Sequence, residues 1–132
     1  MKITIYVDPV GKARPRSTVR KGRVITYTPQ KTAHAENLIR DKVMRLGQYF
    51  ERGTPLAIEA VFFRERPKST KKSVKLPTSR PDGDNYFKLL TDSLEKFVYA
   101  NDSQITTAVI KKRFGTPPRI ELEIKEDVNG TV

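Results

Sequence analysis

The chain has 132 residues and a formal net charge of +11, with 31% charged and 36% hydrophobic residues. This length supports one domain. The absence of cysteine and the presence of one histidine exclude a disulfide scaffold, a thiolate zinc site and a multi-histidine site within one chain. No apolar run approaches the roughly 20 residues of a membrane helix and no signal-peptide pattern is present, so we expect a cytoplasmic protein without a membrane partner. The excess of cations predicts an anionic partner, with nucleic acid the first choice.

The first part of the chain predicts a strand, a basic loop and a second short strand. Met1–Val7 places alternate apolar side chains on one face, which is the period of a half-buried strand. Asp8–Arg23 is basic and contains Pro15 and two glycines, which favour a loop over a regular helix. Val24–Tyr27 is suited to a short strand.

A first helix is predicted over residues 29–46. Thr28 fits the N-cap and Pro29 the first helical position, where the missing amide hydrogen of proline costs nothing. Gly47 follows the last apolar position and predicts the C-terminal end. Only Lys42 interrupts the expected buried stripe of Ala35, Leu38, Ile39, Val43 and Leu46. We interpret this helix as a packing element and His34 as an exposed polar residue.

A central strand and a long basic loop follow. Leu56–Phe63 is an apolar run rich in β-forming residues between two prolines, which predicts a strand inside a sheet. Arg64–Arg80 carries seven basic residues and one acid. Its serine, threonine and proline content predicts a loop that is mobile without a ligand.

The last part predicts a second helix and two strands. The helix is expected from Asp84 to about Val98, with a buried stripe of Phe87, Leu90, Leu94 and Val98. Ile105–Arg113 and Arg119–Glu126 alternate on either side of a Gly-Thr-Pro-Pro turn and look like a hairpin. The tail over residues 127–132 is expected to be frayed. The sum is one mixed α/β (α+β) domain over residues 1–132, with a mixed sheet and two main helices, too few to cover both faces of a large sheet.

Residues 80–104 hold a group of acids that stands out in a basic chain. Asp82 and Asp84 lie one residue apart near the start of the predicted helix, and Lys88 follows one turn later. Carboxylate oxygens are ligands that Mg²⁺ prefers, and phosphodiester hydrolysis uses this ion to activate water and to neutralise developing charge. A lysine beside such a site can stabilise the charged transition state. The pattern suggests a divalent-metal nuclease site, which Asp102 would complete if the fold returns it beside Asp82.

Structural explanations compete at each position. Asp84 suits an N-cap, and Asp82 with the glycine after it suits a turn. Asp84 and Lys88 have the spacing of a surface ion pair worth a few tenths of a kcal/mol, and Asn101-Asp102 fits a turn. The remaining acids of the helix, Asp92 and Glu95, are interpreted as solvated residues.

Three short motifs change this balance: P-D-G-D-N-x-x-K from Pro81, D-x-L from Asp92 and N-D-x-Q-I from Asn101. Together they resemble the core of the RusA family of Holliday junction resolvases. The basic segment Lys12–Arg16 resembles the K-x-R-P-R stretch near the N-terminus of many members. The close match covers about 25 residues, and the order of strands and helices fits along nearly the whole chain. Asn101 stands where some members have a second acid before the third aspartate.

The resemblance implies a homodimeric, Mg²⁺-dependent crossover junction endodeoxyribonuclease of recombination and repair, with Mn²⁺ able to substitute and no small-molecule cofactor. Its DNA partner would be a four-way junction, cut by paired symmetric nicks. Carried over by position, Asp82, Asp84 and Asp102 resemble the metal-binding carboxylates and Lys88 the catalytic lysine. Asn85 matches a recurrent asparagine whose role stays open. Members are often encoded by phages or prophages in bacteria.

Two basic segments, residues 12–23 and 64–80, could hold DNA on either side of the acids. Phosphate contacts give salt-dependent affinity without sequence information, which suits recognition of junction shape. The candidate DNA-binding residues are Lys12, Arg14, Arg16, Lys71, Lys72, Lys75 and Arg80. Tyr27 and Tyr86 could stack on bases, although packing is the favoured interpretation. A C₂ dimer would present one metal site to each of two symmetry-related strands.

Two other functions stay open. A non-catalytic basic nucleic-acid-binding protein, whose acids only cap helices and turns, would bind without metal and without nicking. A nuclease with the same metal site could instead act on flaps or replication forks.

Overall fold

The structure is a computed structural model of the chain and describes residues 1–13, 16–27 and 29–128, with the side chain of Arg16 outside the description. In chain order the elements are β1 (Lys2–Ile5), β2 (Arg16–Arg20), β3 (Arg23–Tyr27), α1 (Gln30–Leu46), β4 (Leu56–Arg64), α2 (Gly83–Leu94), the 3₁₀ turn η1 (Asp102–Gln104), β5 (Ile105–Phe114) and β6 (Arg119–Glu126). This confirms the predicted mixed α/β fold. Among the described residues, no helix is long and apolar enough to cross a membrane.

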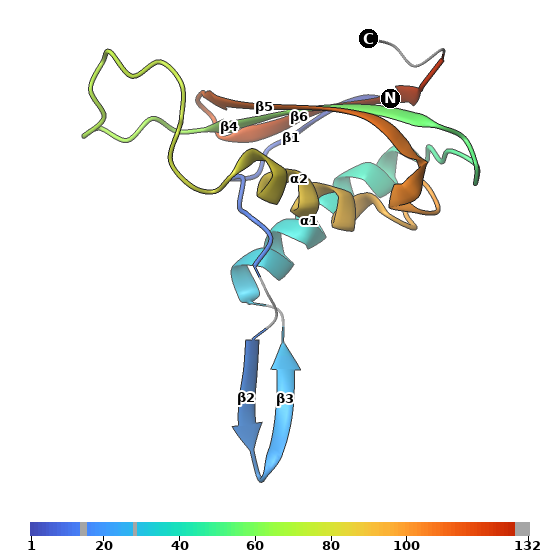
Figure 1. Cartoon of the computed structure of the whole chain (residues 1–132), viewed down its shortest axis with the longest axis horizontal. Coiled ribbons are helices and arrows are strands. Elements are labelled where there is room, and N and C mark those ends of the chain that lie inside the picture. The colour runs from blue at the N-terminus through green and yellow to red at the C-terminus, as the bar shows by residue number, and fades with distance from the viewer. Residues whose placement is uncertain (14–15, 28, 129–132) are drawn as a thin grey trace.

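The main sheet has four strands in the order β1-β6-β4-β5. β4 runs antiparallel to β6 and parallel to β5, and β6 is antiparallel to β1. A parallel neighbour needs a crossover connection, and α2 lies within the one that joins β4 to β5. Figure 1 shows α1 and α2 on the same face of this sheet. The two helices therefore cover one face, as their number predicts.

The core lies between that sheet face and the helices. Alternate residues of β4 and β6 pair across the strands on the covered face, as in Ala60 with Leu122 and Phe62 with Ile120. The ring of Tyr86 on α2 stacks on Phe62 with centroids 5.1 Å apart. Tyr86 is only 2% exposed. It is therefore a core residue, as predicted, and does not stack on bases.

The predicted hairpin of the last two strands is wrong, because β4 lies between β5 and β6. The four residues that join them cross the end of β4, where the amide of Gly115 donates to the carbonyl oxygen of Arg64 at 3.0 Å. A Cβ at Gly115 would lie 2.6 Å from Cδ1 of Phe63. Glycine therefore permits the crossing, while the apolar β4 takes the central place in the sheet.

The loop predicted for residues 8–23 is wrong over its last part, which forms strand β2. β2 pairs with β3 antiparallel in a separate two-stranded sheet. Lys21 and Gly22 form the turn with φ of 50° and 75°, the left-handed conformation that matches the twist of a two-residue hairpin. The basic residues hid the alternation of a strand.

The first helix is close to its prediction. α1 begins at Gln30, one residue later than predicted, and Gly47 ends it in the left-handed conformation with φ of 64°. Thr28 lies outside the described residues, and Pro29 occupies the N-cap position. His34 is exposed as predicted. The buried face is rotated from the prediction, with Thr32, Ala35, Glu36, Ile39 and Val43 inside and Leu38 and Leu46 outside.

The second helix and the tail depart from their predictions. α2 ends at Leu94 rather than near Val98, because Lys96 adopts a left-handed φ of 73° and its amide donates to the Tyr99 carbonyl. Asp127 is not frayed: its carboxylate accepts from the hydroxyls of two threonines of β5 at 2.6 Å. The tail beyond residue 128 lies outside the described residues.

Candidate active site

Two carboxylates stand at the first turn of α2. Asp82 occupies the N-cap position in an extended conformation, and its backbone carbonyl accepts from the amides of Asn85 and Tyr86 at 3.1 Å. Its side chain makes no capping hydrogen bond. Asp84 lies in the first turn, and both aspartates are exposed. In the described part of the chain no cation forms an ion pair with either carboxylate. The backbone carbonyl of Asp82, rather than its side chain, therefore binds the amides of the first turn. Both carboxylates are available to bind a ligand.

Lys88 follows on the same helix, and its ion pair is with a residue of the next turn rather than with Asp84 on the turn before. Its Nζ lies 3.0 Å from Oδ1 of Asp92, one turn later, and not against Asp84. This hydrogen bond raises the pKa of the Lys88 ammonium, with further contributions from the charges of Asp102 and Glu95. Lys88 is thus held as a cation with its side chain 61% exposed.

Asp92 is part of an ion-pair network rather than a solvated helix residue, which corrects its interpretation. Its Oδ2 lies 3.2 Å from Nζ of Lys12, which also contacts Oε2 of the nearly buried Glu36 at 3.2 Å. Arg40 lies 3.8 Å from the same glutamate and donates to the Asp92 carbonyl. The network joins α1, α2 and the segment before β2. The i, i+4 spacing from Lys88 could have indicated one of these contacts, but nothing in the sequence indicates Lys12.

Asp102 lies at the start of η1, beyond the other end of α2. Its Oδ1 accepts from the Tyr99 hydroxyl at 2.7 Å, and its amide donates to Oε2 of Glu95 at 2.8 Å. Glu95 therefore holds the backbone before β5, which corrects its interpretation as a solvated residue. Burial raises the pKa of the Asp102 carboxyl, and the charge of Glu95 adds to this, while the Tyr99 hydroxyl and Lys88 act in the opposite direction.

Asp82 and Asp84 both lie at the first turn of α2, whereas Asp102 contacts a side chain that reaches a later turn of this helix. The Tyr99 hydroxyl that contacts Asp102 also lies 3.4 Å from the Thr91 carbonyl oxygen. Thr91 follows Asp84 by seven residues, a separation of about 10 Å along a helix axis. Within the described residues no three or more acidic or histidine side chains are grouped so that they could hold a metal ion. The described residues of one copy therefore present a pair of carboxylates at the start of α2 and a third carboxylate, Asp102, beyond its end.

The basic loop of residues 64–80 is folded around two of its own arginines. Arg64 donates to the Arg80 carbonyl and to Oγ of Ser79 at 3.0 and 2.9 Å, and Arg66 donates to the carbonyls of Lys71 and Val74. The predicted DNA-binding side chains of this loop, Lys71, Lys72, Lys75 and Arg80, are exposed. Arg14 lies outside the described residues, as does the side chain of Arg16.

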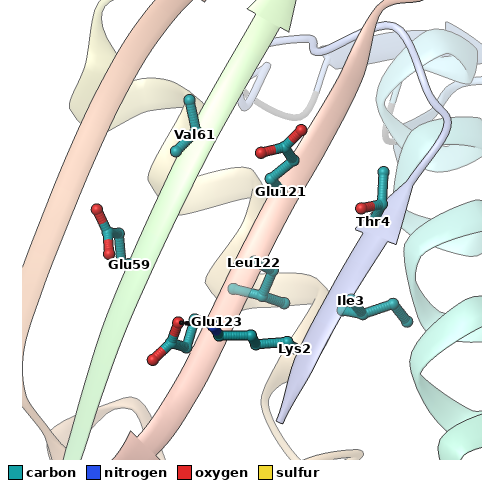
Figure 2. A pocket seen from close by; sticks show the side chains of 8 residues that line it. All are labelled: Lys2, Ile3, Thr4, Glu59, Val61, Glu121, Leu122 and Glu123. Atoms are coloured by element: carbon teal, nitrogen blue, oxygen red, sulfur yellow. Dashed lines mark ion pairs between the residues drawn. The ribbon is translucent and has the colours of Figure 1, made fainter.

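A second group of acids lies on the open face of the sheet, away from α2. Figure 2 shows Glu59, Glu121 and Glu123 around a shallow hollow between β1, β6 and β4. Each is paired with a cation: Lys111 lies 2.8 Å from Glu59, Arg119 lies 3.0 Å from Glu121, and Lys2 lies 3.5 Å from Glu123. These ion pairs compensate the charge of the acids, which distinguishes this group from the aspartates at the start of α2, unpaired among the described residues.

A family model and one of two similar proteins name the same family. The family model described as "Endodeoxyribonuclease RusA" matches residues 7–125. The chain is similar to "Uncharacterized protein YqaN" of Bacillus subtilis (strain 168), with 29% identity over 143 aligned positions that cover 96% of both chains. It is also similar to "Crossover junction endodeoxyribonuclease rusA" of Lactococcus phage r1t, with 41% identity over 78 positions that cover 58% of this chain and 59% of the phage protein.

Proposed function

The chain belongs to the RusA family of endodeoxyribonucleases, and from this premise we propose that it resolves four-way DNA junctions by paired symmetric nicks. The observation that carries the proposal is the pair of exposed carboxylates at the first turn of α2, free of cations among the described residues and followed one turn later by a charged lysine. The side chain of Asp82 makes no capping hydrogen bond, so capping of the helix does not account for this carboxylate. The similarity to a phage crossover junction endodeoxyribonuclease supports the choice of substrate.

Nucleases of this family are typically metal-dependent, and the donors at α2 suit Mg²⁺ or, as a substitute, Mn²⁺. Asp82 and Asp84 supply exposed, hard oxygen ligands on the first turn of a helix. When bound, the ion would supply charge neutralisation at the scissile phosphate and activation of water. Lys88 would place its ammonium against the phosphate oxygens as negative charge grows there. Asp92 fixes the direction of Lys88 through their 3.0 Å contact.

A homodimer would explain the position of the third carboxylate. In one copy, Asp102 contacts Tyr99 beside Thr91, and Thr91 lies about two turns of α2 beyond Asp84; among the described residues no three such side chains are grouped so that they could hold an ion. In a C₂ dimer, Asp102 of a second copy could complete the site, and the two sites would face the two symmetry-related strands of a junction.

Phosphate contacts would come from the exposed side chains of the basic loop, Lys71, Lys72, Lys75 and Arg80, and from Arg14 and Arg16. The loop leads directly into Pro81 and Asp82, so DNA held by it would lie beside the carboxylates. Lys12 was among the predicted contacts, but its ion pairs with Glu36 and Asp92 favour a role in the fold.

The test uses a labelled synthetic four-way junction with the wild-type protein and with Asp82→Asn, first in Mg²⁺ and then in excess EDTA. We expect symmetric nicks that require the metal and are lost in the variant, while junction binding remains. Asp41→Asn is a matched control, because Asp41 is an exposed acid on α1 whose side chain is 63% accessible. Binding without cleavage under every metal would leave a non-catalytic binding protein, and preferred cleavage of flaps or forks would keep the site and change the substrate.

A further inference from the structure

The hairpin of β2 and β3, here called the arm (Arg16–Tyr27), projects from the rest of the molecule. Figure 1 shows it extending away from the helices and the main sheet. Every described side chain from Ser17 to Tyr27 is exposed, and neither strand pairs with another described element. A two-stranded hairpin alone is marginally stable in water. Because no other described strand pairs with the arm, we expect a partner to stabilise it.

The strand register divides the arm into two faces. Val19 pairs with Val24, and the hydroxyls of Ser17 and Thr26 lie 3.4 Å apart on the same side. This uncharged face ends near the tip in two valines that are 69% and 71% exposed. The opposite, cationic face carries Arg20 paired with Arg23, and a hollow there is lined by Arg20, Lys21, Arg23 and Ile25.

The charge of the arm identifies the class of partner. The chain has 15 acidic residues, yet none lies between Asp8 and Glu36. The cations of the arm therefore have no acidic neighbour in their own segment, whereas those of the helices and the sheet are repeatedly paired. Such a surface suits a polyanion, and a two-stranded β-ribbon has the width that a DNA groove accepts.

The base of the arm adjoins the candidate active site. The amide of Lys12 donates to the Asn85 carbonyl at 3.2 Å. A Cβ at Gly11 would lie 2.5 Å from Nδ2 of the same asparagine and 3.0 Å from Cβ of Pro81. The segment that leads into the arm thus packs on the first turn of α2, next to Asp82 and Asp84. DNA bound at the carboxylates would lie within reach of the arm.

We propose that the arm is a DNA-binding ribbon that enters the branch point of the junction, an inference that rests on the proposed function. In this arrangement Arg20, Lys21 and Arg23 contact phosphates. The Val19–Val24 pair packs on the faces of bases that stacking would cover in an intact duplex. Apolar side chains act in this way when they enter a distorted base step, and at a branch point the stacking is already interrupted. The valines would therefore give preference for junctions, while the cations would give affinity for any DNA.

The experiment measures binding in EDTA, so that cleavage does not interfere, by fluorescence anisotropy on a four-way junction and on a duplex of matched sequence. We expect Val19→Ser with Val24→Ser to lower the ratio of junction to duplex affinity roughly tenfold with duplex binding unchanged. The triple variant Arg20→Gln, Lys21→Gln and Arg23→Gln should weaken both and reduce the slope of log K against log salt by about 2.7. Met44→Ser, at an apolar side chain of α1 that is 58% exposed, is the control.

A 2-aminopurine base at the branch point gives a second readout, because its fluorescence should change on binding of the wild type and not of the valine variant. An unchanged affinity ratio in the valine variant would overturn the inference. So would conversion of a dimer to monomers by the arm variants without DNA, since the arm would then be a protein interface. If the wild type binds junctions through the valines but cuts nothing in Mg²⁺, the proposed function fails and the arm stands. If the wild type cuts junctions in Mg²⁺ but the valine variant keeps the affinity ratio, the inference about the arm fails and the proposed function stands.

Discussion

Replacement of Lys12 by methionine tests whether this lysine holds the fold together or binds DNA. Its ammonium lies 3.2 Å from both Glu36 and Asp92, and the three side chains are 26%, 9% and 22% exposed. Exposed ion pairs contribute about 0.2–1 kcal/mol, whereas removal of one partner from a buried pair costs about 3–5 kcal/mol. Because this network is partly buried, we expect Lys12→Met to lower the free energy of unfolding by about 1–3 kcal/mol. Among the ion pairs of the described residues, Glu36 would keep the 3.8 Å contact with Arg40.

The assay is urea unfolding, followed by junction binding at several salt concentrations. Lys71→Met is the matched control, because Lys71 is exposed in the basic loop and the structure gives its side chain no ion pair among the described residues. That variant should keep its stability within about 0.5 kcal/mol and lose about 0.9 from the salt slope per phosphate contact. If Lys12→Met behaves like this control, with full stability and a reduced slope, the structural role argued for Lys12 is refuted.

Three further predictions follow from the same contacts. Gly115→Ala should destabilise the fold by about 1–3 kcal/mol in urea unfolding, since its Cβ would lie 2.6 Å from Phe63; a neutral result would contradict the tight crossing over β4. In Tyr99→Phe without metal, NMR titration of the Asp102 carboxyl should give a pKa raised further above its ordinary value, because the lost hydroxyl stabilises the carboxylate; a lower pKa would show that the hydroxyl acts otherwise. Mg²⁺ at a hundred times its Kd should stabilise the wild type by about 2.7 kcal/mol and Asp82→Asn much less, as thermal unfolding can measure; equal stabilisation would place the ion elsewhere.

The sequence correctly predicted those elements whose local residue pattern also determines where they lie in the fold. Leu56–Phe63 is apolar throughout, and it forms the central strand β4. The pairing of β5 and β6 was mispredicted because a short connection favours a hairpin, and whether β4 enters between two strands depends on contacts far apart in the chain. The sequence did not predict strand β2, because a segment rich in arginine and lysine is typical of a loop. Only its partner β3 and the two-residue turn make it a strand.

In the candidate site, too, the sequence predicts the positions of some residues and not of others. Asp82 and Asp84 are two residues apart at a helix start, so their proximity was fixed by local geometry. The place of Asp102 depends on the left-handed φ of 73° at Lys96, which ends α2 early and reverses the chain. A lysine with that conformation carries no sequence signal, because φ above zero is uncommon for residues other than glycine and asparagine. The sequence could therefore name the third carboxylate but not its distance from the other two.

Net charge alone also does not say which cations are available to DNA. Lys12, Arg64 and Arg66 are bound to oxygen atoms of their own chain, so they add to the charge of +11 without offering a free contact. The predicted DNA contacts of the arm and of the basic loop are different, because seven of these side chains are exposed: Arg20, Lys21, Arg23, Lys71, Lys72, Lys75 and Arg80. If all seven reached phosphates, log K would fall with log salt at a slope of about −6 per protomer. A slope near half that value would mean that only one of the two surfaces binds DNA, and the triple variant of the arm would then show which one, because its slope would be unchanged if the loop alone made the contacts.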